Sequence, residues 1–529
     1  MRAPTDRPFS EPPGLQRRTV LLGLLAGGCA PEASALQGGW VGTHPERGHR
    51  LRAALPRADG PLKKTGVLIV GAGIAGLACA RALAHRGIDD FALLDLEDTA
   101  GGNSRGHVLA GSPCPLGAHY LPIPGPEARE VTQLLHELGL ARQHLGRTEW
   151  DDRHLCHSPQ ERLFIDGAWH EGLLPPAEDA ATREQYRGFA GLVARAQREV
   201  GFAMPTRRAS WTPAHADLDA QTFAAWLDRE GLNDTRLRWY LDYCCRDDFG
   251  ASADGVSAWA GLHYFASRHG FHAPGDETAE REPVLTWPEG NGWISDRIAA
   301  PLRDRLHVGR SVLRVAEHKH GVELLAWNEA AGAPERWQAG AVVLATPLFI
   351  AARLLAAPPD ALRSATAQLS YAPWLTANLA LREPLLIRPG APPAWDNVRY
   401  GTSALGYVDA YHQTLDPTPR PPLLTAYFAL PARLRGDLLR QPWEHWARVV
   451  SDELGQTHPD LPAKLERIDL CRFGHAMSIP TPGLRGSPAL AALNETGGRV
   501  AFAHADLAGY SVFEEAYTAG VEAASRIRL

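Results

Sequence analysis

Three glycines at fixed spacing after an apolar run carry the most specific chemistry in this chain. Gly71, Gly73 and Gly76 form a G-x-G-x-x-G pattern directly after the run Val67–Val70, and small residues typical of a helix follow. In such a unit the first glycine permits a tight strand-to-helix turn. The second lets the backbone approach a pyrophosphate, and the third lets the helix pack closely on the strand. The pattern therefore predicts a binding site for a dinucleotide.

Two neighbouring features complete this unit. Ile74 and Ala75 begin the expected helix, whose free N–H groups point at the pyrophosphate. Asp95 closes the next apolar run, Phe91–Leu94, and its carboxylate can accept hydrogen bonds from ribose hydroxyls. These residues by themselves do not distinguish NAD from FAD.

Apolar runs elsewhere in the sequence would position this site. The runs at 341–346 and 499–503 are typical of parallel strands buried on both faces, and strands are also expected near 306–315 and 321–327. Region 126–284 is helical and aromatic, which indicates an inserted region that packs against the core or lines a pocket. Near the C-terminus, Ser511 and Glu514 form an S-x-x-E capping box that predicts a helix starting at about Ser511.

The composition is that of an ordinary globular protein. At 529 residues, with 45% hydrophobic and 22% charged side chains, the chain is long enough for two or more domains. Its net charge of −6 gives no reason to expect nucleic acid or an anionic membrane surface as a partner. The sequence shows no metal-ligand spacing, Ser-His-Asp order or Walker loop, so we expect no metal. Among the seven cysteines, the adjacent Cys244 and Cys245 are predicted to be reduced thiols, with a strained vicinal disulfide as the alternative.

The N-terminus has the features of an export signal. Arg17 and Arg18 precede an apolar stretch at 19–28 that is too short to span a bilayer and suits a signal-peptide core. A twin arginine at this place indicates export by the Tat route. Two processing sites are open: a lipoprotein-like box that would lipidate Cys29 and attach the protein to a membrane, or cleavage after Ala35. We therefore expect residues 1–35 to be a Tat signal peptide and the protein to be periplasmic or a membrane-anchored lipoprotein.

With its βαβ unit, the paired glycines Gly101-Gly102 and a C-terminal strand-to-helix unit, the chain resembles the FAD-dependent amine oxidase and phytoene desaturase superfamily over about residues 64–529. The resemblance implies an α/β fold of the amine-oxidase-like two-domain type. A Rossmann-like FAD-binding domain would comprise residues 63–125, 285–350 and 471–529. An inserted, mainly helical α+β substrate domain would comprise residues 126–284 and 351–470, and residues 36–62 would be an irregular linker or arm.

The resemblance also implies which residues hold the FAD. The acid after the second strand would bind the adenosine ribose, the paired glycines would lie over the diphosphate and ribityl chain, and the strand near 310 would offer backbone atoms to adenine. An acid near the C-terminus would hold the ribityl or diphosphate region, ahead of a flavin-facing helix. In this chain these positions are Asp95, Gly101, Gly102, Val312, Asp506, Val512 and Phe513. Asn103 stands where an arginine commonly follows the two glycines, with Arg105 as a substitute, and no cysteine is placed for a covalent bond to FAD at the C-terminal motif.

One departure from the family bears directly on the reaction. Monoamine and polyamine oxidases place a lysine near flavin N5, on a strand leading into an x-E-P turn. Here Thr376 or Ala377 stands at that position. The chain's four lysines, Lys63, Lys64, Lys319 and Lys464, offer no replacement. Amine oxidation by the lysine-assisted route is therefore not expected.

Because a flavin performs hydride chemistry itself, the protein mainly binds, orients and excludes water. His475 is a candidate acid or base, with a structural role as the alternative, and His119 and Tyr120 are candidates for the flavin-facing side. His504 is expected near the cofactor. The cluster Arg246–Gly250 with Asp254 is either a surface loop or a site for a polar or cationic substrate, and Tyr371 and Trp374 are either core residues or pocket walls.

These observations predict an exported FAD-dependent oxidoreductase. It would take a hydride from a small organic substrate, an amine or a C–C bond flanked by activating groups, and pass electrons to oxygen or another acceptor. One alternative is a desaturase or isomerase of an apolar substrate. A second is a flavin-binding lipoprotein without catalytic activity.

Overall fold

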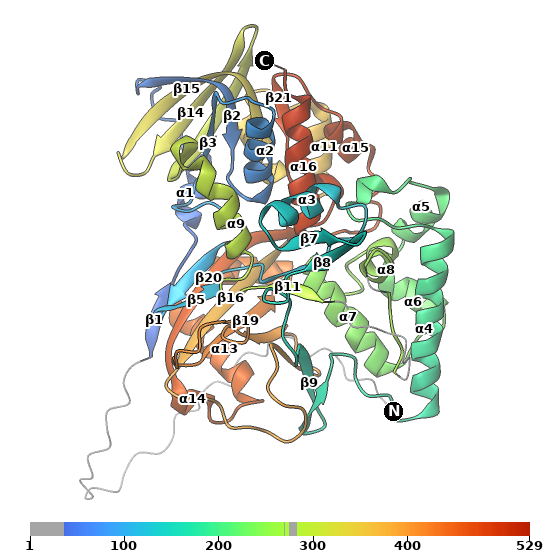
Figure 1. Cartoon of the computed structure of the whole chain (residues 1–529). Helices are drawn as coiled ribbons and strands as arrows, with labels where there is room; N and C mark the ends of the chain where they lie inside the picture. Colours follow the sequence, from blue (N-terminus) through green and yellow to red (C-terminus); the bar gives the residue numbers. More distant parts are fainter. Residues whose placement is uncertain (1–35, 269, 275–282, 529) are drawn as a thin grey trace, which may run out of the picture. The chain divides into compact units, whose positions relative to one another are not determined.

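The computed structural model describes residues 36–268, 270–274 and 283–528, and the predicted signal peptide with Cys29 lies outside them. Two large sheets organise these residues (Figure 1). The first has seven strands: β12 (Leu306–His307), β3 (Phe91–Leu94), β2 (Leu62–Val70), β15 (Ala333–Leu344), β14 (Gly321–Asn328) and β13 (Arg310–His318) in that order, with β21 (Val500–Phe502) beside β15.

The centre of this sheet is parallel and buried on both faces. β12, β3, β2, β15 and β21 pair in parallel, whereas β13, β14 and β15 form an antiparallel meander. Val67 and Ile69 pack on one face, and Leu68 and Val70 pack on the other. Because successive side chains of a strand point to opposite faces, a continuous apolar run must be covered twice.

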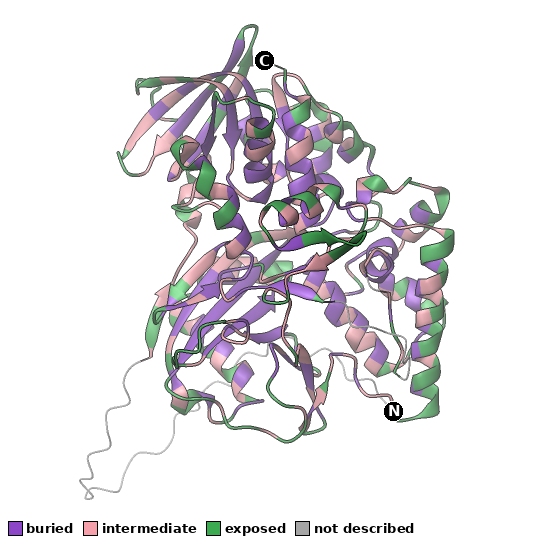
Figure 2. Ribbon diagram, viewed as in Figure 1, coloured by how far each residue is buried: buried purple, intermediate pink, exposed green. Residues whose placement is uncertain are grey.

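Helices supply both covers. One face packs against α2 (Ile74–His85), α3 (Arg129–Glu137), α9 (Gly292–Ala299) and α16 (Phe513–Arg526). The other face packs against α10 (Leu348–Leu354), α11 (Asp360–Gln368) and α15 (Pro488–Asn494). The buried residues of both layers are purple in Figure 2. This arrangement confirms the predicted α/β fold with a Rossmann-like domain.

The second sheet has eight strands. Its order is β1 (Gln37–Trp40), β20 (Leu465–Ser478), β16 (Tyr371–Leu381), β19 (Leu423–Ala429), β18 (Gly406–Asp409), β17 (Asp396–Arg399), β9 (Glu161–Ile165) and β10 (Ala168–Glu171). Neighbouring strands are antiparallel except for two parallel pairs, β1 with β20 and β9 with β17.

Most of the helical part predicted at 126–284 packs on this second sheet, whereas α3 covers the first. An aromatic core joins the second sheet to α4 (Ala180–Glu199), α6 (Phe223–Arg229), α7 (Thr235–Phe249) and α8 (Ala258–Ala266), which are green in Figure 1. α5 (Pro213–Asp219) lies against α8, and α12 (Arg435–Arg440) and α13 (Trp443–Gly455), followed by α14 (Leu461–Lys464), lie beside β20. Short pairs complete the fold: β4 (Gly106–Leu109) with β5 (Ser112–Pro115), β6 (Tyr120–Pro122) with β11 (Val284–Thr286), and β7 (Ala141–His144) with β8 (Arg147–Trp150).

Two local expectations differ from the structure. Residues 36–62, expected to be irregular, include β1, α1 (Pro45–His49), the short 3-10 turn η1 (Arg50–Arg52) and the first residue of β2, because partners far along the chain hold them. The capping box is wrong: α16 begins at Phe513 after Val512, and no side chain caps it. The hydroxyl of Ser511 instead accepts a hydrogen bond from the backbone N–H of Ser478, at 3.1 Å.

Cys244 and Cys245 are both buried free thiols, as predicted. Among the described residues, no helix combines the length and apolar character needed to cross a membrane. The same residues contain no group of three or more His, Cys, Asp or Glu side chains placed to hold a metal ion.

A glycine contact between α2 and α16 gives a test of the fold. A Cβ at Gly520 would lie 2.1 Å from the backbone oxygen of Ala75 and 2.9 Å from Cβ of Ala78. Because the nearest atom is backbone, Gly520→Ala must push the two helices apart, and we expect a loss of about 1–3 kcal/mol in the free energy of unfolding, measured by denaturant titration. Gly455→Ala is the matched control, since Gly455 ends α13 with nothing within 4 Å of its added Cβ. Equal stability of the two variants would contradict close packing at Gly520.

Candidate functional site

A cavity of about 480 Å³ lies where the two helices that pack through Gly520 begin. Its walls come from segments far apart in the sequence, from the first glycine turn to α16. The residues predicted from the sequence that line it are Gly71, Gly73, Ile74, Ala75, Asp95, Gly101, Gly102, Asn103, His119, Tyr120, Val312, His475, His504, Asp506, Val512 and Phe513. Gly76 lies behind this wall, in the packing of α2 on β2.

The glycine turn has the geometry that its spacing indicates. Gly71 has φ +100°, and a Cβ there would lie 2.4 Å from the carbonyl oxygen of Ala345 at the end of β15. A Cβ at Gly76 would lie 1.8 Å from the carbonyl oxygen of Gly71, so only glycine lets α2 approach β2 this closely. Gly73 precedes the helix as its N-cap and contributes no capping side chain. The first N–H groups of α2 therefore face the cavity for an anion.

Asp95 lies at the predicted place at the end of β3, with both carboxylate oxygens engaged. Oδ2 accepts from the backbone N–H of Ala72 at 2.6 Å, and Oδ1 accepts from the backbone N–H of Glu97 at 2.8 Å. Burial raises the pKa of Asp95 above its ordinary value, while the two N–H donors oppose that shift. Each oxygen keeps a second lone pair, so the carboxylate can still accept from ribose hydroxyls.

The paired glycines cross directly over the first turn. Gly101 has φ +117° and donates its N–H to the carbonyl of Ala72 at 2.8 Å, which fixes the second turn on the first. Asn103 donates from its side-chain amide to the carbonyl of Ala476 at 2.8 Å, on the far wall of the cavity. Arg105 does not line the cavity: its Nε donates to the carbonyl of Gly102 at 2.9 Å and so holds the turn from behind.

The C-terminal acid sits on the opposite side of the cavity. Asp506 is fully buried, and its Oδ2 accepts from the hydroxyl of Tyr371 at 2.6 Å and from the backbone N–H of Leu348 at 2.9 Å. The ring of His504 lies 3.1 Å from Oδ1 of Asp506, which places His504 beside the cavity as expected. Burial alone would raise the pKa of Asp506, but these contacts with His504, Tyr371 and Leu348 outweigh it and keep that pKa below its ordinary value, so the carboxylate is ionised.

The lining is suited to an elongated ligand with an anionic centre. α2 and α16 both present uncapped N-termini to the cavity, and each carries a partial positive charge there. The hydroxyl of Thr346 is buried at the cavity wall with no hydrogen-bond partner among the described residues, so a bound polar group would satisfy it.

A second cavity, of about 720 Å³, continues from the first. His119, Tyr120, Asp247, Arg268 and Tyr427 line both. The second cavity therefore joins the dinucleotide site to the region between α7, α8 and the eight-stranded sheet.

Aromatic rings and carboxylates face each other in this second cavity. His119 stacks on Tyr427 with ring centroids 4.2 Å apart, and Trp395 lies 5.4 Å from the same imidazole. Burial and the neighbouring Asp248 raise the pKa of Asp247 to about 7, and burial raises the pKa of Asp396 well above its ordinary value. Half-buried carboxylates beside aromatic faces are suited to an organic cation, which would restore their ionised form.

His119 and His475 are neutral at ordinary pH. Burial lowers the pKa of His119 to about 3. Burial, with the charge of Arg435 next, lowers the pKa of His475 to about 4, where the ring packs 4.8 Å from that of Phe349. Both rings line the cofactor cavity, but only His119 also lines the second cavity. His119 is therefore on the substrate side, and His475 is on the cofactor side alone.

The structure brings together more residues than the sequence indicated. The segment Arg246–Gly250 is the end of α7 and not a surface loop, and it turns Asp247 and Asp248 toward the cavities; Asp254 stays exposed. Tyr371 and Trp374 are cavity walls. Four residues at the second cavity were missed, Arg268, Trp395, Asp396 and Tyr427, since each lies in a segment whose pattern gives only a helix end or a strand.

Thr376, at the lysine position of the amine oxidases, is fully buried in β16, and its hydroxyl has no hydrogen-bond partner among the described residues. Ala377 is fully buried beside it. None of the four lysines lines either cavity. The structure therefore agrees with the sequence that no lysine serves this site.

Comparison with known proteins places this site in a family. The family described as flavin containing amine oxidoreductase matches residues 74–528. A search of curated protein sequences gave no match.

Solved structures share the fold at low identity. A putrescine oxidase bound to putrescine has a TM-score of 0.65 at 18% identity, covering 88% of this chain and 99% of its own. Cyclohexylamine oxidase from Brevibacterium oxydans IH-35A has a TM-score of 0.64 at 19% identity, and the match covers 88% of this chain and 98% of that one. A CLA-producing fatty acid isomerase from P. acnes has a TM-score of 0.60 at 14% identity, and the match covers 87% of this chain and 98% of that one.

A family match over most of the chain, together with the cavity lined by the two glycine turns and α16, identifies the ligand as FAD. The chain belongs to the flavin containing amine oxidoreductase family and is a flavin-dependent oxidoreductase.

Proposed function

We propose that this enzyme oxidises a small organic amine that enters the second cavity as a cation. The observation that carries the proposal is a pair of half-buried carboxylates, Asp247 and Asp396, whose pKa values are raised and which line an aromatic-walled cavity continuous with the FAD site. Arg268, the one arginine among the described residues that line this cavity, is paired with Asp248 at 2.9 Å. The site therefore favours a positive ligand.

The residues present fit FAD along its whole length. Asp95 and Val312 would hold the adenosine half, and the N-terminus of α2 with Gly101-Gly102 would hold the diphosphate. Thr346 offers a buried hydroxyl without a partner among the described residues, and the uncapped N-terminus of α16 would stabilise negative charge on the flavin ring. When bound, FAD supplies the acceptor for the hydride and passes electrons on to oxygen or another acceptor.

The protein's own part is to bind the amine and to move one proton. An amine loses hydride readily only when its nitrogen is neutral, so the ammonium proton must first leave. Asp247 lines both cavities, and its pKa of about 7 is matched to accepting that proton onto a carboxylate oxygen near neutral pH. His119 is too weak a base for this step and instead forms, with Tyr427, a stacked wall that excludes water.

Isomerisation or desaturation of an apolar substrate is the second candidate. The aromatic walls favour it, and one structure of the same fold is named as a fatty acid isomerase. The two half-buried carboxylates weigh against it, because an apolar ligand would leave them without a counter-charge. The non-catalytic alternative is not retained, since the family is one of oxidoreductases.

A substrate screen that follows anaerobic bleaching of the bound flavin separates the two candidates. Primary and secondary amines should bleach the flavin, while neutral isosteres of the same shape should not. Bleaching by apolar substrates alone, or turnover of polyenes without net reduction, would contradict amine oxidation.

We also propose that the protein is exported by the Tat route. The twin arginine at Arg17-Arg18 and the short apolar stretch after it support this, and Tat passengers cross the membrane folded. Whether Cys29 carries a lipid is a separate part of the same proposal.

Asp247→Asn and Asp396→Asn test the cation site. Each change removes one counter-charge while keeping the shape, so kcat/KM for an amine substrate should fall by about 10–100-fold. Steady-state kinetics give the measurement, and the flavin spectrum shows that the cofactor site is intact. Asp254→Asn is the matched control, because Asp254 lies on an exposed turn a few residues away. Unchanged kcat/KM in both cavity variants would exclude a cationic substrate.

The affinity for a permanently charged cationic probe should fall as the pH is lowered through about 7. Burial raises the pKa of Asp247 to about 7, so the carboxylate is ionised above that pH and protonated below it. The affinity for benzyltrimethylammonium, followed by the change in the flavin spectrum, should therefore weaken by up to about tenfold per pH unit below pH 7. The probe cannot titrate, which leaves the protein as the source of the change. Asp247→Asn should bind weakly with a flatter profile, and a wild-type profile in that variant would assign the titration to another group.

Arg17→Lys with Arg18→Lys should abolish export, because the twin arginine is what the Tat machinery recognises. Cell fractionation followed by immunoblotting measures this. Cys29→Ser separates the two processing sites: a lipoprotein would move from the membrane to the soluble exported fraction, whereas cleavage after Ala35 would give no change. Export of the double-lysine variant at the wild-type level would rule out the Tat route.

A further inference from the structure

Residues 37–51, called the strap below, form part of the wall of the FAD cavity. Arg47, Gly48 and Leu51 line the cavity together with Leu96 and Val312 at the adenosine end. Neither the glycine motif nor the C-terminal motif includes this segment. The strap is therefore a part of the cavity wall that lies outside both FAD-binding motifs.

The first half of the strap is fixed to the substrate sheet. β1 adds a parallel strand to the edge of that sheet, beside β20, with Gln37 opposite Arg467 and Trp40 opposite Leu470. Beyond the strand, the hydroxyl of Thr43 donates to the carbonyl of Arg472 at 3.0 Å.

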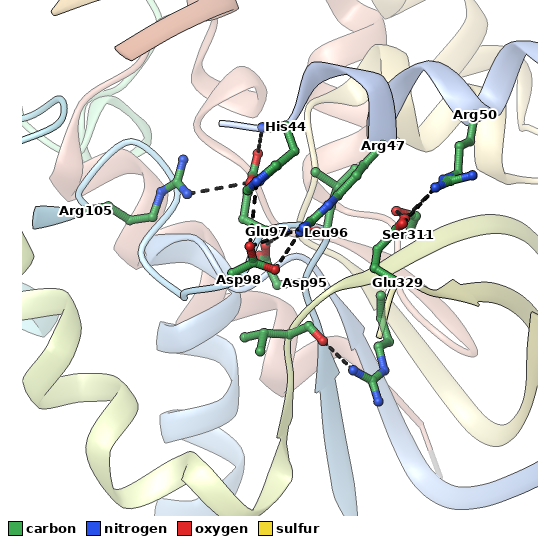
Figure 3. Close-up of polar contacts among 12 residues, drawn as sticks. His44, Arg47, Arg50, Asp95, Leu96, Glu97, Asp98, Arg105, Ser311 and Glu329 are labelled. Carbon is green, nitrogen blue, oxygen red and sulfur yellow. Dashed lines mark hydrogen bonds and ion pairs between the residues drawn. The ribbon is translucent and has the colours of Figure 1, made fainter. Parts of the chain in front are cut away.

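The second half of the strap is fixed to the FAD-binding sheet by charge (Figure 3). The backbone N–H of His44 donates to Oε1 of Glu97 at 3.0 Å, and Nδ1 of its ring lies 2.6 Å from Oε2. Arg47 donates to both carboxylate oxygens of Asp98, at 2.7 and 3.1 Å, and also to the carbonyl of Leu96 at 2.9 Å.

A third ion pair extends this attachment to the meander. Arg50 donates to both oxygens of Glu329, at 3.1 and 2.7 Å, and the hydroxyl of Ser311 donates to Oε1 of the same carboxylate at 2.8 Å (Figure 3). Ser311 precedes Val312, whose backbone is the expected contact of adenine. Arg50 thus holds the strap against the strand that would carry the adenine.

The strap's cations balance three carboxylates near the adenosine end of the cavity. Glu97 and Asp98 lie two and three residues after Asp95, and Glu329 accepts a hydrogen bond from Ser311 in the strand of Val312. The hydrogen bonds from Arg47 hold the pKa of Asp98 below its ordinary value, so that carboxylate stays ionised and paired. Without the strap, Asp98 would lose its bidentate arginine partner and Glu329 would lose Arg50, which would leave negative charge next to the adenosine end of the cavity.

We propose that the strap is a working part of the FAD site: it closes the adenosine end of the cavity, and FAD leaves only when the strap detaches from Glu97, Asp98 and Glu329. The ligand that it recognises is the adenosine diphosphate half of the cofactor. The proposal rests on FAD binding alone and is independent of the substrate.

The attachment is suited to opening without unfolding of the protein. Apart from Leu51, which packs on the apolar core, the second half of the strap is held to the FAD-binding sheet by polar contacts. In two of its ion pairs one partner is largely exposed, since the side chains of Asp98 and Arg50 are 59% and 40% exposed. Ion pairs of this kind are individually weak and are screened by salt. Release of FAD should therefore become faster as the ionic strength rises.

The double variant Arg47→Ala, Arg50→Ala tests the strap in the full-length holoenzyme. We expect FAD release, followed by the fluorescence of free flavin after dilution, to become about tenfold faster and to lose most of its salt dependence. Arg57→Ala is the matched control, because Arg57 is exposed, lies outside the strap and has no ion pair to the described residues. Its release rate should equal that of the wild type.

Two further measurements distinguish a strap from a purely structural arm. Hydrogen exchange of the strap amides should be slower with FAD bound than without it. The charge swap Arg47→Asp with Asp98→Arg should bring release back toward the wild-type rate, whereas either change alone should speed it. An unchanged release rate in the double variant, or equal exchange of the strap with and without FAD, would overturn the proposal.

Discussion

The close approach of α2 to β2 on one side and to α16 on the other is the contact on which the site depends. Gly76 allows the first approach and Gly520 allows the second, because a Cβ at either place would meet a backbone oxygen at 1.8 or 2.1 Å. The two helices consequently begin side by side at one cavity, with uncapped N-termini. A ligand with a diphosphate at one helix and an electron-accepting ring at the other receives a stabilising dipole at both ends.

The first cavity stabilises negative charge, whereas the second cavity holds carboxylates whose ionised form is disfavoured. Burial and the charge of Asp248 raise the pKa of Asp247, although Arg268 and Arg246 oppose that shift. Burial, followed by the charges of Glu161 and Asp247, raises the pKa of Asp396. The ionised form of these carboxylates is therefore disfavoured near neutral pH, and a bound cation would stabilise it. The proposal of an amine substrate rests on this disfavoured charge and not on any single catalytic residue.

The sequence predicted the FAD-binding part well because its rules are local. The roles of the three motif glycines, Gly71, Gly73 and Gly76, are set within one turn of the chain. Continuous apolar runs in the sequence indicate parallel strands that are buried on both faces. The substrate side depends on contacts between distant segments: Asp396 begins a short strand, and Asp247 is turned inward only because α7 packs on the second sheet. The predicted helix cap at Ser511 is wrong for the same reason, because the hydroxyl of Ser511 accepts a hydrogen bond from the backbone N–H of Ser478 in β20.

The strap shows how such distant contacts also set the order of assembly. Thr43 and Arg472, which join the strap to β20, are 429 residues apart in the chain. The strap can therefore take its place only after β20 has entered the substrate sheet, and the cavity is complete only when α16, which comes later in the chain, has packed on α2. Under the proposal above, FAD enters while the strap is detached, and closure of the strap over the adenosine end follows binding. A protein proposed to cross a membrane in the folded state would in this way carry its cofactor with it.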